Sequence, residues 1–512
     1  MSDIDHLLTP TPGPFLLTMG VYFLVIAAIG YVAARQTRDM KEFLVMGGKA
    51  GAIVSGIAYF ATQYSMSTFM GVPAIAYGNG FAGMSITIPG VAFSMLIPAL
   101  LVGRRLMELG RRNHYLTMSD YLADRYQSSP MRAIHAIAMV VFLVAMTGAQ
   151  LVGAGIIVKT FTGYPEWVGV VVTGGIVILY CMYGGMRGAM LTDVLQGSLM
   201  VLTAVVTFVI SVRAGGGLEA ITAQLATDSP GHLAHPGSKG EYGWSVYVTM
   251  ILMWSFFTIG QPTLFTKFYA MKSHAVLFKS VLLGTLGMLV SATLIEWAGV
   301  NAFISLPGLV GRDADFVVPM LLQRSLDPIL ASVMIAGIVS AGMSTVSALM
   351  VVATGGISRD LYQKLINPAA SDARVLRLSH WVTLLIGLAG IAIGVLKPAS
   401  IFEIVRFAFG GLGIWVIAVI LGMYWKRATA AGALAGVLLG ELCFVVLKAG
   451  WLDGWLDGWL SLRTDPLLPA WLLGMAVAVV VSLATPAVER EVLERHFTTA
   501  RNDRSKPCSS AT

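Results

Sequence analysis

Charged residues are scarce in this 512-residue chain, where they make up 12% of the sequence. A soluble globular domain carries about 25%, so most of the surface of this protein meets something other than water. Cysteine is scarcer still: the three cysteines offer neither a disulfide framework nor the ligand spacing of a metal site. These shortages exclude a disulfide-stapled secreted domain and favour a chain that resides in a lipid bilayer.

Long apolar stretches are what the chain has in abundance, since 56% of its residues are hydrophobic. A membrane-spanning helix needs about 20 mostly apolar residues. The predicted fold class is therefore an all-α polytopic membrane protein with about thirteen transmembrane helices. The predicted spans are residues 14–35, 50–77, 83–103, 132–158, 166–184, 189–212, 244–269, 276–303, 328–357, 375–396, 400–424, 429–449 and 466–487.

The positions of lysine and arginine indicate how these spans are oriented. About three quarters of the 34 Lys and Arg residues fall in alternate loops and in the C-terminal tail, with Lys267 counted in one of those loops. Positive charge accumulates on the cytoplasmic side of membrane proteins. We therefore predict an outside N-terminus, a cytoplasmic C-terminus and a plasma-membrane location, namely the bacterial cytoplasmic membrane. The same pattern accounts for the net charge of +7, so this charge does not indicate a nucleic-acid partner. We expect the protein to contact the lipid bilayer, and we expect no obligate protein partner.

Two predicted spans contain polar interruptions, which are costly in a membrane and mark functional sites. The second span holds the run Thr62-Gln-Tyr-Ser-Met-Ser-Thr68, and the seventh is interrupted by Gly260-Gln-Pro262. Hydroxyl groups can support a break in a helix, which frees carbonyl oxygens for a cation. Interruptions at corresponding positions of two halves are typical of an inverted-repeat transporter site. The alternative for the polar run is a helix-packing face of small residues.

The ninth predicted span carries a set of oxygen-bearing residues on one face. Ala341, Ser344 and Thr345 are spaced i, i+3 and i+4, so they lie together on a helix. Na⁺ is a hard cation and takes oxygen ligands, as other hard cations do. Two hydroxyls with carbonyls from a facing broken helix would supply them. Ser347 lies one turn beyond Ser344 and suits a neighbouring position, while small-residue packing is again the alternative.

Ionisable residues inside spans are further candidates. Asp193 lies just inside the start of the sixth span, where it either serves transport or caps that helix. Glu403 and Arg406, at i and i+3, either neutralise each other or leave Arg406 to receive a substrate carboxylate, which a guanidinium binds bidentately. Glu296 has no obvious local partner, and no role is assigned to it.

Taken together, these motifs resemble the sodium/solute symporter family over residues 14–485. The resemblance is carried by Gly184–Gln196, by Ala341-x-x-Ser-Thr345 followed by Ile357–Tyr362, and by Asn113–Tyr126 and Leu421–Lys426. It implies a LeuT-like 5+5 inverted repeat within spans two to eleven. The implied organisation is an N-terminal outside segment with the first span at 1–47, the first repeat at 48–213, an outer loop at 214–243, the second repeat at 244–424, two C-terminal spans at 425–488 and a cytoplasmic tail at 489–512.

The resemblance also implies a sodium site between the second and ninth spans. Its ligands would be the carbonyls of Ala61, Tyr64 and Ala341 and the hydroxyls of Ser344 and Thr345. Some members hold a second Na⁺ near the equivalents of Asp193, Ser344 and Ser347, but a further serine of that pattern is Ala348 here. Na⁺ is thus the expected coupling ion, its number stays open, and we expect no other metal and no organic cofactor.

The solute is expected beside the two interruptions, near Gln63, Thr68, Gln150, Trp254, Gln261 and Arg406. Gln63 stands where proline-transporting members carry Asp, and Thr263 where many members carry His, so proline is disfavoured. Among subgroups the chain is most similar to the sodium/pantothenate symporters, followed by monocarboxylate carriers.

The predicted function is sodium-coupled import of a small organic anion or zwitterion by alternating access. A carboxylate such as pantothenate is favoured, with a short-chain monocarboxylate or an amino acid as alternatives. A transporter-like sensor would keep the same fold. A membrane-embedded enzyme would need a nucleophile–base pair or metal ligands inside the membrane, which the sequence does not offer, so no enzymatic activity is predicted.

Overall fold

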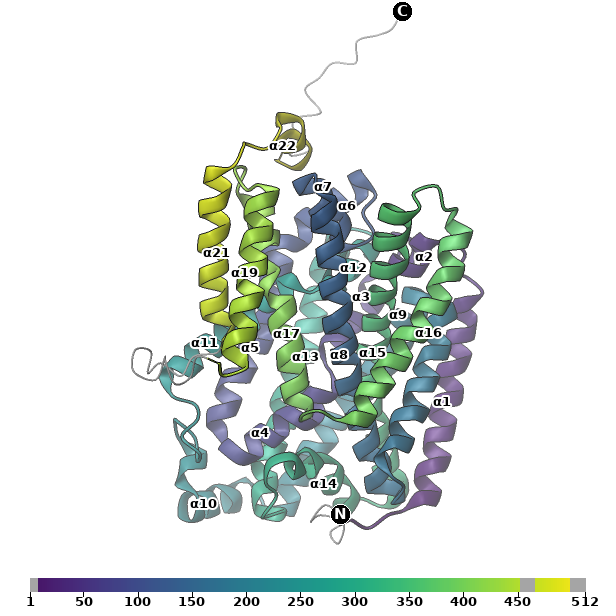
Figure 1. Cartoon of the computed structure of the whole chain (residues 1–512). Coiled ribbons are helices and arrows are strands. Elements are labelled where there is room, and N and C mark those ends of the chain that lie inside the picture. The colour runs from purple at the N-terminus through teal and green to yellow at the C-terminus, as the bar shows by residue number, and fades with distance from the viewer. Residues whose placement is uncertain (1–7, 452–465, 498–512) are drawn as a thin grey trace, which may run out of the picture.

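The computed structural model describes residues 8–451 and 466–497, which form a bundle of helices that run roughly side by side (Figure 1). The first half of the chain comprises α1 (Pro12–Ala34), α2 (Met40–Val45), η2 (Met46–Gly48), α3 (Ala52–Gln63), η3 (Ser67–Gly71), α4 (Val72–Asn79), α5 (Phe81–Pro98), η4 (Ala99–Gly103), α6 (Arg104–Asn113), α7 (Met118–Tyr126), α8 (Ser129–Thr162), α9 (Glu166–Ala214) and α10 (Leu218–Asp228). The second half comprises η5 (Pro230–Leu233), α11 (Trp244–Phe256), η6 (Phe257–Gly260), α12 (Pro262–Ala270), α13 (His274–Ser305), η7 (Gly311–Phe316), α14 (Val317–Ser325), α15 (Pro328–Gly355), η8 (Gly356–Ile366), α16 (Asp372–Leu396), α17 (Ile401–Ile414), α18 (Val416–Tyr424), α19 (Ala430–Lys448), α21 (Leu467–Ala484) and α22 (Arg490–Phe497).

Ten helices of the described residues are long and apolar enough to cross a membrane. An eleventh candidate is the pair Trp244–Gly260 and Pro262–Ala270, which is bent by 57°. The other predicted spans are helical too. α3 and α4 cover most of residues 50–77, and α9 covers both predicted spans 166–184 and 189–212. The count of thirteen and the boundaries of the two repeats stay predictions.

α9 is too long to be one span. Its 49 residues would extend for about 74 Å, more than twice the ~30 Å hydrocarbon core. Gly185 interrupts it with φ 52° and ψ −146°, a conformation that favours glycine. A Cβ at Gly185 would also lie 2.7 Å from the carbonyl oxygen of Phe43. The interruption separates the predicted spans 166–184 and 189–212.

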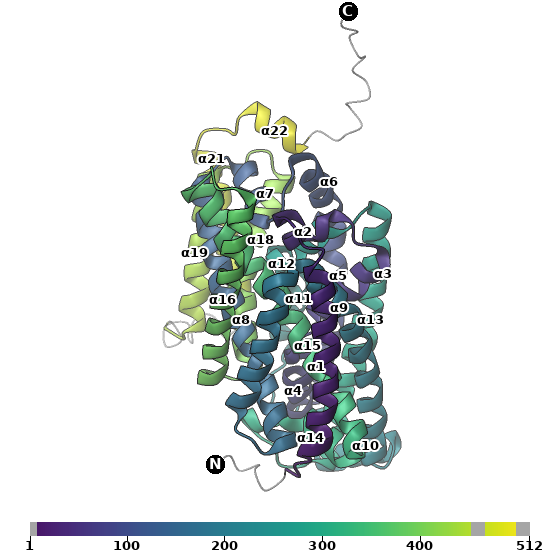
Figure 2. The same cartoon turned by 90° about the vertical axis from the view of Figure 1, so that its right-hand side faces the viewer.

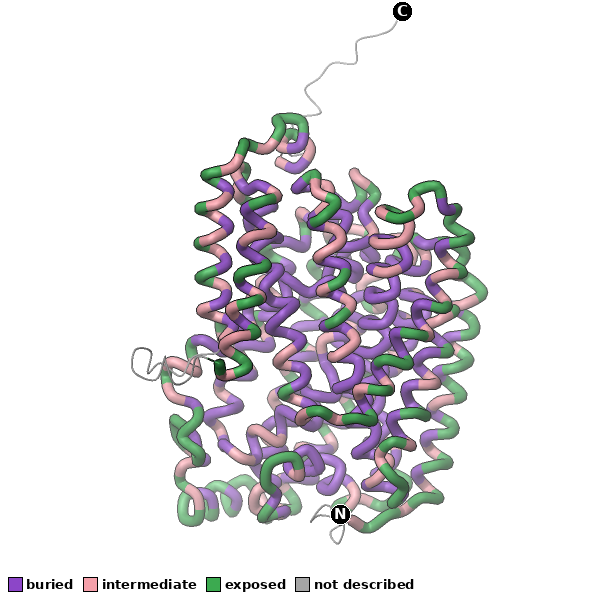
Figure 3. Tube along the Cα trace, in the orientation of Figure 1, coloured by how far each residue is buried: buried purple, intermediate pink, exposed green. Residues whose placement is uncertain are grey.

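The two ends of the bundle carry different short helices. α10 and α14 lie at the end where α1 begins, and α22 lies at the opposite end beside α6 and α7 (Figures 1 and 2). Burial also differs between helices (Figure 3). α8, α15 and α17–α18 are mostly buried, whereas α1, α19 and α21 are mostly exposed along their apolar faces. The buried helices surround the interrupted segments, and the exposed ones form the surface suited to lipid.

Candidate cation and solute site

The two predicted interruptions are real breaks, and they meet in the centre of the bundle. α3 ends at Gln63, and Tyr64 then has an extended backbone with φ −93° and ψ 97°. η6 ends at Gly260, and Gln261 is extended with φ −83° and ψ 119° before Pro262 opens α12. The side chain of Gln63 donates from Nε2 to Oε1 of Gln261 at 3.3 Å. The structure therefore joins the interruptions of the two halves through one hydrogen bond.

The first break releases two backbone carbonyls from helical hydrogen bonding. In an uninterrupted helix the Ser65 amide would donate to the carbonyl of Ala61, and the Thr68 amide to that of Tyr64. Here the Ser65 amide donates to Thr68 Oγ1 at 3.3 Å, and the Thr68 amide donates to the Ser65 carbonyl at 2.9 Å. The carbonyls of Ala61 and Tyr64 consequently lack these amide donors. They are the two carbonyls of this helix that the family resemblance assigned to a cation.

The hydroxyl face of α15 packs against this break. Thr345 Oγ1 donates to the carbonyl oxygen of Thr62 at 3.4 Å, which brings Thr345 to the end of α3. Ser344 Oγ donates to Oδ1 of Asp193 at 2.6 Å, which leaves its lone pairs available to another group. The predicted cation ligands are all fully buried: Ala61, Tyr64, Ala341, Ser344 and Thr345.

Lys267 corrects one expectation from the sequence. It does not lie in a loop: α12 carries it into the bundle, where its side chain is 1% exposed and its Nζ lies 3.0 Å from Oδ2 of Asp193. Asp193 is fully buried and does not cap a helix from the interface. Ser347, the other residue predicted for a second Na⁺, donates from Oγ to the carbonyl of Ser344 at 2.9 Å. A lysine ammonium thus contacts the carboxylate predicted to serve a second ion.

A small cavity of about 20 Å³ lies directly beside the first break, a volume that suits about one water molecule. Gln63, Thr68 and Trp254, predicted to contact the solute, line it. The remaining lining residues are Ser65, Ser67, Val72, Thr87, Val91, Ser94, Phe257, Met288, Glu296 and Phe409. The cavity thus joins polar groups from α3, η3, α5, α11 and α13 with an apolar wall.

The other predicted solute residues are placed differently. Gln150 accepts the amide hydrogen of Met66 on Oε1 at 2.7 Å, so it supports the break. Gln261 holds Gln63 and does not line the cavity. Arg406 lies on α17 one turn before Phe409, a lining residue. Glu403 accepts hydrogen bonds from the amide and hydroxyl of Ser400, which closes a capping box at the start of α17 in place of an ion pair with Arg406.

Glu296 is a cavity residue to which no role could be assigned from the sequence. Thr87 donates from Oγ1 to Oε2 of Glu296, whereas Oε1 has no hydrogen-bond partner within the described residues. The indole nitrogen of Trp254, in the same wall, also lacks a partner there. An ionisable residue within a span is itself the sequence signal for such a site. Its partner on α5 could not be found, because Thr87 is 209 residues away.

A cluster of ion pairs closes the end of the bundle near α22. Asp120 on α7 accepts hydrogen bonds from Arg359 and from Arg132, the latter at 2.8 Å. Asp360 accepts from Thr117 at 2.9 Å and lies 3.4 Å from Arg132. Burial alone would raise the pKa of Asp120, but the guanidinium groups of Arg359 and Arg132 lower that pKa to about 2. Two motifs that resemble the family, Asn113–Tyr126 and Ile357–Tyr362, are therefore held together by charge.

Comparison with known proteins places this geometry in a family. A model of the "Sodium:solute symporter family" matches residues 43–440. The chain is 27% identical over 440 residues to the sodium/pantothenate symporter of Escherichia coli (strain K12), covering 84% of this chain and 90% of that one. It is also 27% identical over 500 residues to the sodium/proline symporter of the same organism, covering 94% and 95%.

Solved structures give the same answer for the fold. A Na⁺-coupled sialic acid symporter in a substrate-bound, outward-open state matches with a TM-score of 0.81 at 17% identity, covering 93% of this chain and 99% of that chain. Mhp1, a nucleobase-cation-symport-1 family transporter, matches with a TM-score of 0.54 at 13% identity, covering 88% and 97%. These likenesses confirm the predicted all-α inverted-repeat fold. The relatives named above are transporters, not enzymes. Because the family model matches most of the sequence, this chain belongs to the sodium:solute symporter family.

Proposed function

We propose that this protein is a sodium-coupled symporter that imports a small carboxylate-bearing solute across the bacterial cytoplasmic membrane, with its N-terminus outside. The observation that carries the proposal is the pair of carbonyls released at the first break, Ala61 and Tyr64, beside the hydroxyls of α15. Carbonyl and hydroxyl oxygens are the ligands that a hard cation takes. A Na⁺ ion there would be held by those carbonyls, the carbonyl of Ala341 and the hydroxyls of Ser344 and Thr345.

Na⁺ binding and solute binding would be coupled because the residues proposed to bind each of them lie along one interrupted segment. Gln63 and Thr68 line the cavity, and the carbonyls of Ala61 and Tyr64 lie within a few residues of them. A Na⁺ ion that bridges α3 and α15 would fix the backbone between these positions and so order the solute groups. Na⁺ then raises the affinity for solute, and solute raises the affinity for Na⁺ by the same factor. Both dissociate when the site opens to the cytoplasm.

A carboxylate such as pantothenate is the first candidate solute. The relatives include sodium/pantothenate symporters, and Arg406 lies one turn from a cavity-lining residue. The guanidinium group of arginine matches a carboxylate bidentately.

An amino-acid-like zwitterion is the second candidate, and Glu296 favours it. Its Oε1 has no hydrogen-bond partner within the described residues, so it is placed to accept a hydrogen bond from an ammonium group of the solute. The unpartnered indole N–H of Trp254 would donate to the carboxylate of the same solute. Sodium/proline symporters are equally similar relatives, although Gln63 and Thr263 disfavour proline itself.

Uptake by reconstituted proteoliposomes tests both the coupling and the solute class. Radiolabelled pantothenate, propionate and a panel of amino acids would each be assayed with an inward Na⁺ gradient and with K⁺ in its place. We expect one class of solute to accumulate only with the Na⁺ gradient. Thr345→Ala should raise the Na⁺ concentration for half-maximal uptake about tenfold, because the loss of one buried oxygen ligand costs about 1.4 kcal/mol of binding free energy.

Thr345→Ser keeps the hydroxyl and is the matched control, so its Na⁺ dependence should stay near that of the wild type. Accumulation that is independent of Na⁺, or equal Na⁺ dependence in Thr345→Ala and the wild type, would contradict the cation site. Binding of solute without any uptake would instead identify a sensor.

A further inference from the structure

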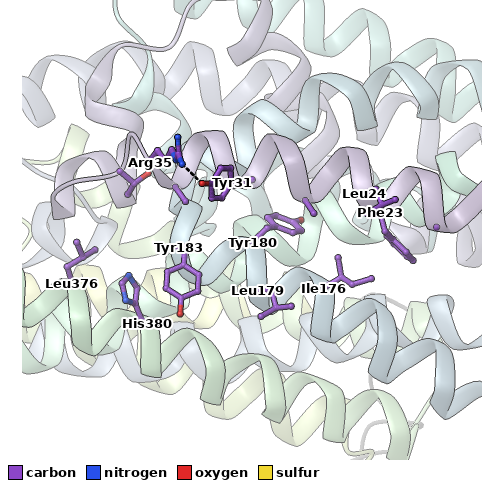
Figure 4. Close-up of a pocket in the computed structure, with 15 residues that line it drawn as sticks. Phe23, Leu24, Tyr31, Arg35, Ile176, Leu179, Tyr180, Tyr183, Leu376 and His380 are labelled. Carbon is purple, nitrogen blue, oxygen red and sulfur yellow. Dashed lines mark hydrogen bonds between the residues drawn. The ribbon is translucent and has the colours of Figure 1, made fainter.

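A large groove lies on the outer surface of the bundle, away from the solute cavity. It has a volume of about 950 Å³ and is bounded by α1, α9 and α16 (Figure 4). Small residues on one face of α1 hollow it out, and Ala27 is among them. From Gly20 to Arg35 the groove follows α1 for about 22 Å, at 1.5 Å per residue. Its length therefore suits one extended acyl chain.

The wall of the groove is apolar along most of its length. Phe23 and Leu24 of α1 face Ile176 and Leu179 of α9. Leu24 and Leu179 are 72% and 62% exposed, values that a surface in water would rarely tolerate in one continuous patch. α1 is also among the least buried of the long helices. The groove thus opens onto the surface that meets the lipid chains.

One end of the groove is polar and positively charged. Arg35, Tyr183 and His380 gather there, with Arg35 held over the Tyr31 ring at 4.6 Å and hydrogen-bonded to its hydroxyl. His380 packs beside Tyr183 with ring centroids 5.1 Å apart. Among the residues that the structure describes, no carboxylate lies within 4.0 Å of the Arg35 guanidinium. Its charge is therefore available to an anionic group.

The flank of α16 next to this end is basic as well. Arg374 and Arg377 line a second hollow of about 480 Å³ together with Tyr362 and Trp381. Trp381 is 68% exposed, and tryptophan in such a position is typical of the boundary between lipid chains and headgroups. The charged end of the groove thus lies at headgroup level, near the end of the bundle that carries α22 (Figure 1).

We propose that the groove is a binding site for one anionic phospholipid, whose acyl chain lies between α1, α9 and α16 and whose phosphate binds Arg35 and His380. A snorkelling arginine would explain the position of Arg35 alone. It does not explain why this cation and the histidine lie together at the mouth of an acyl-length groove, with two further arginines of α16 in the separate hollow along the same helix. Basic pockets between membrane helices recognise anionic headgroups in this way.

Native mass spectrometry of the delipidated full chain in detergent tests the proposal. The probes are phosphatidylglycerol and phosphatidylcholine with identical acyl chains. We expect one phosphatidylglycerol to be retained in preference to phosphatidylcholine, and Arg35→Gln to weaken its retention about fivefold, since one basic residue contributes about that factor near an anionic lipid. Lys279→Gln is the matched control, because Lys279 is exposed on α13 and does not line the groove.

A second pair of variants tests the groove itself. Ala27→Phe fills the middle of the groove and should reduce retention of phosphatidylglycerol, whereas Ala28→Phe adds the same ring to a position outside it. Equal retention of the two lipids by the wild type would overturn the proposal. So would equal behaviour of Arg35→Gln and Lys279→Gln, or a wild-type dimer that Ala27→Phe converts to a monomer, since a second copy would then occupy the groove.

Discussion

Replacing Lys267 by methionine tests how the buried ion pair with Asp193 contributes to stability and to ion binding. Both side chains are buried, with Nζ 3.0 Å from Oδ2 and Ser344 donating to Oδ1 at 2.6 Å. Lys267→Met keeps most of the side-chain volume and removes the charge, so the Asp193 carboxylate stays buried without its cation. Breaking a buried pair in this way costs about 3–5 kcal/mol.

The effect on thermal unfolding can be worked out from the length of the chain. An unfolding entropy of about 2.1 cal/mol/K per residue gives about 1.1 kcal/mol/K for 512 residues. The melting temperature of Lys267→Met in detergent should therefore fall by about 3–5 °C. Combining Lys267→Met with Asp193→Asn removes both charges and keeps a side-chain carbonyl that can accept from Ser344, so the double variant should recover most of the loss. A cycle of this kind isolates the pair from other effects of each substitution.

The same variants bear on the number of sodium ions. If the Lys267 ammonium takes the place of a second Na⁺, Lys267→Met should make the Na⁺ dependence of uptake steeper, with the Hill coefficient rising from about 1 toward 2. The double variant, which has no carboxylate, should return to a coefficient of about 1. The reasoning is refuted if Lys267→Met unfolds at the wild-type temperature, or if the single and double variants are equally destabilised.

Three further predictions concern other contacts of the described residues. Glu296→Gln should weaken uptake of a zwitterionic solute at least tenfold and leave uptake of a simple anion within about twofold, as competition assays with both classes would reveal. Gln150→Leu leaves a buried amide at the helix break without an acceptor, which costs about 1–3 kcal/mol and should lower the apparent Na⁺ affinity in uptake assays. Burial raises the pKa of Asp124, but hydrogen bonds from His496 and Tyr115 outweigh it and lower that pKa below its usual value. Burial also lowers the pKa of His496 in the folded state, so docking of α22 is fully stabilised only above about pH 6.5. It weakens as the pH falls and His496 and Asp124 take up protons, which limited proteolysis between pH 3 and 7 would detect.

The helix breaks could be predicted from the sequence because their causes are local. Hydroxyl-rich residues precede Thr68, and Pro262 lacks an amide hydrogen, so each segment disfavours a continuous helix by itself. The capping box of Ser400 and Glu403 is equally local, and its Ser-x-x-Glu spacing is a known helix-start signature. The i, i+3 spacing of Glu403 and Arg406 suggested an ion pair instead, and that interpretation was wrong because the carboxylate caps the helix.

What the sequence could not supply is which helices face one another. Lys267 follows a break and lies near other cations in the sequence, so the sequence suggests that it belongs to a cytoplasmic loop. The 57° bend instead brings it to Asp193, which lies 74 positions earlier in the chain. The pairing of Thr87 with Glu296 likewise depends on the packing of α5 against α13. Both contacts join residues that no helical period relates, and a single sequence carries no signal for them.

These long-range contacts place the candidate cation site within a closed ring of interactions. Around that ring lie Gln63, Gln261, Lys267, Asp193, Ser344, Thr345 and Thr62. The ring passes through both interrupted segments, since Gln63 ends α3 and Gln261 precedes α12, and it returns to α3 through the hydroxyl face of α15.

A cation bound beside Ser344 and Thr345 would therefore act on both interruptions at once. It would hold the carbonyls released at the first break directly. It would reach the second break through Asp193 and Lys267, because α12 moves with the residue that anchors it. A two-state element biased from one site in this way is what thermodynamic coupling requires.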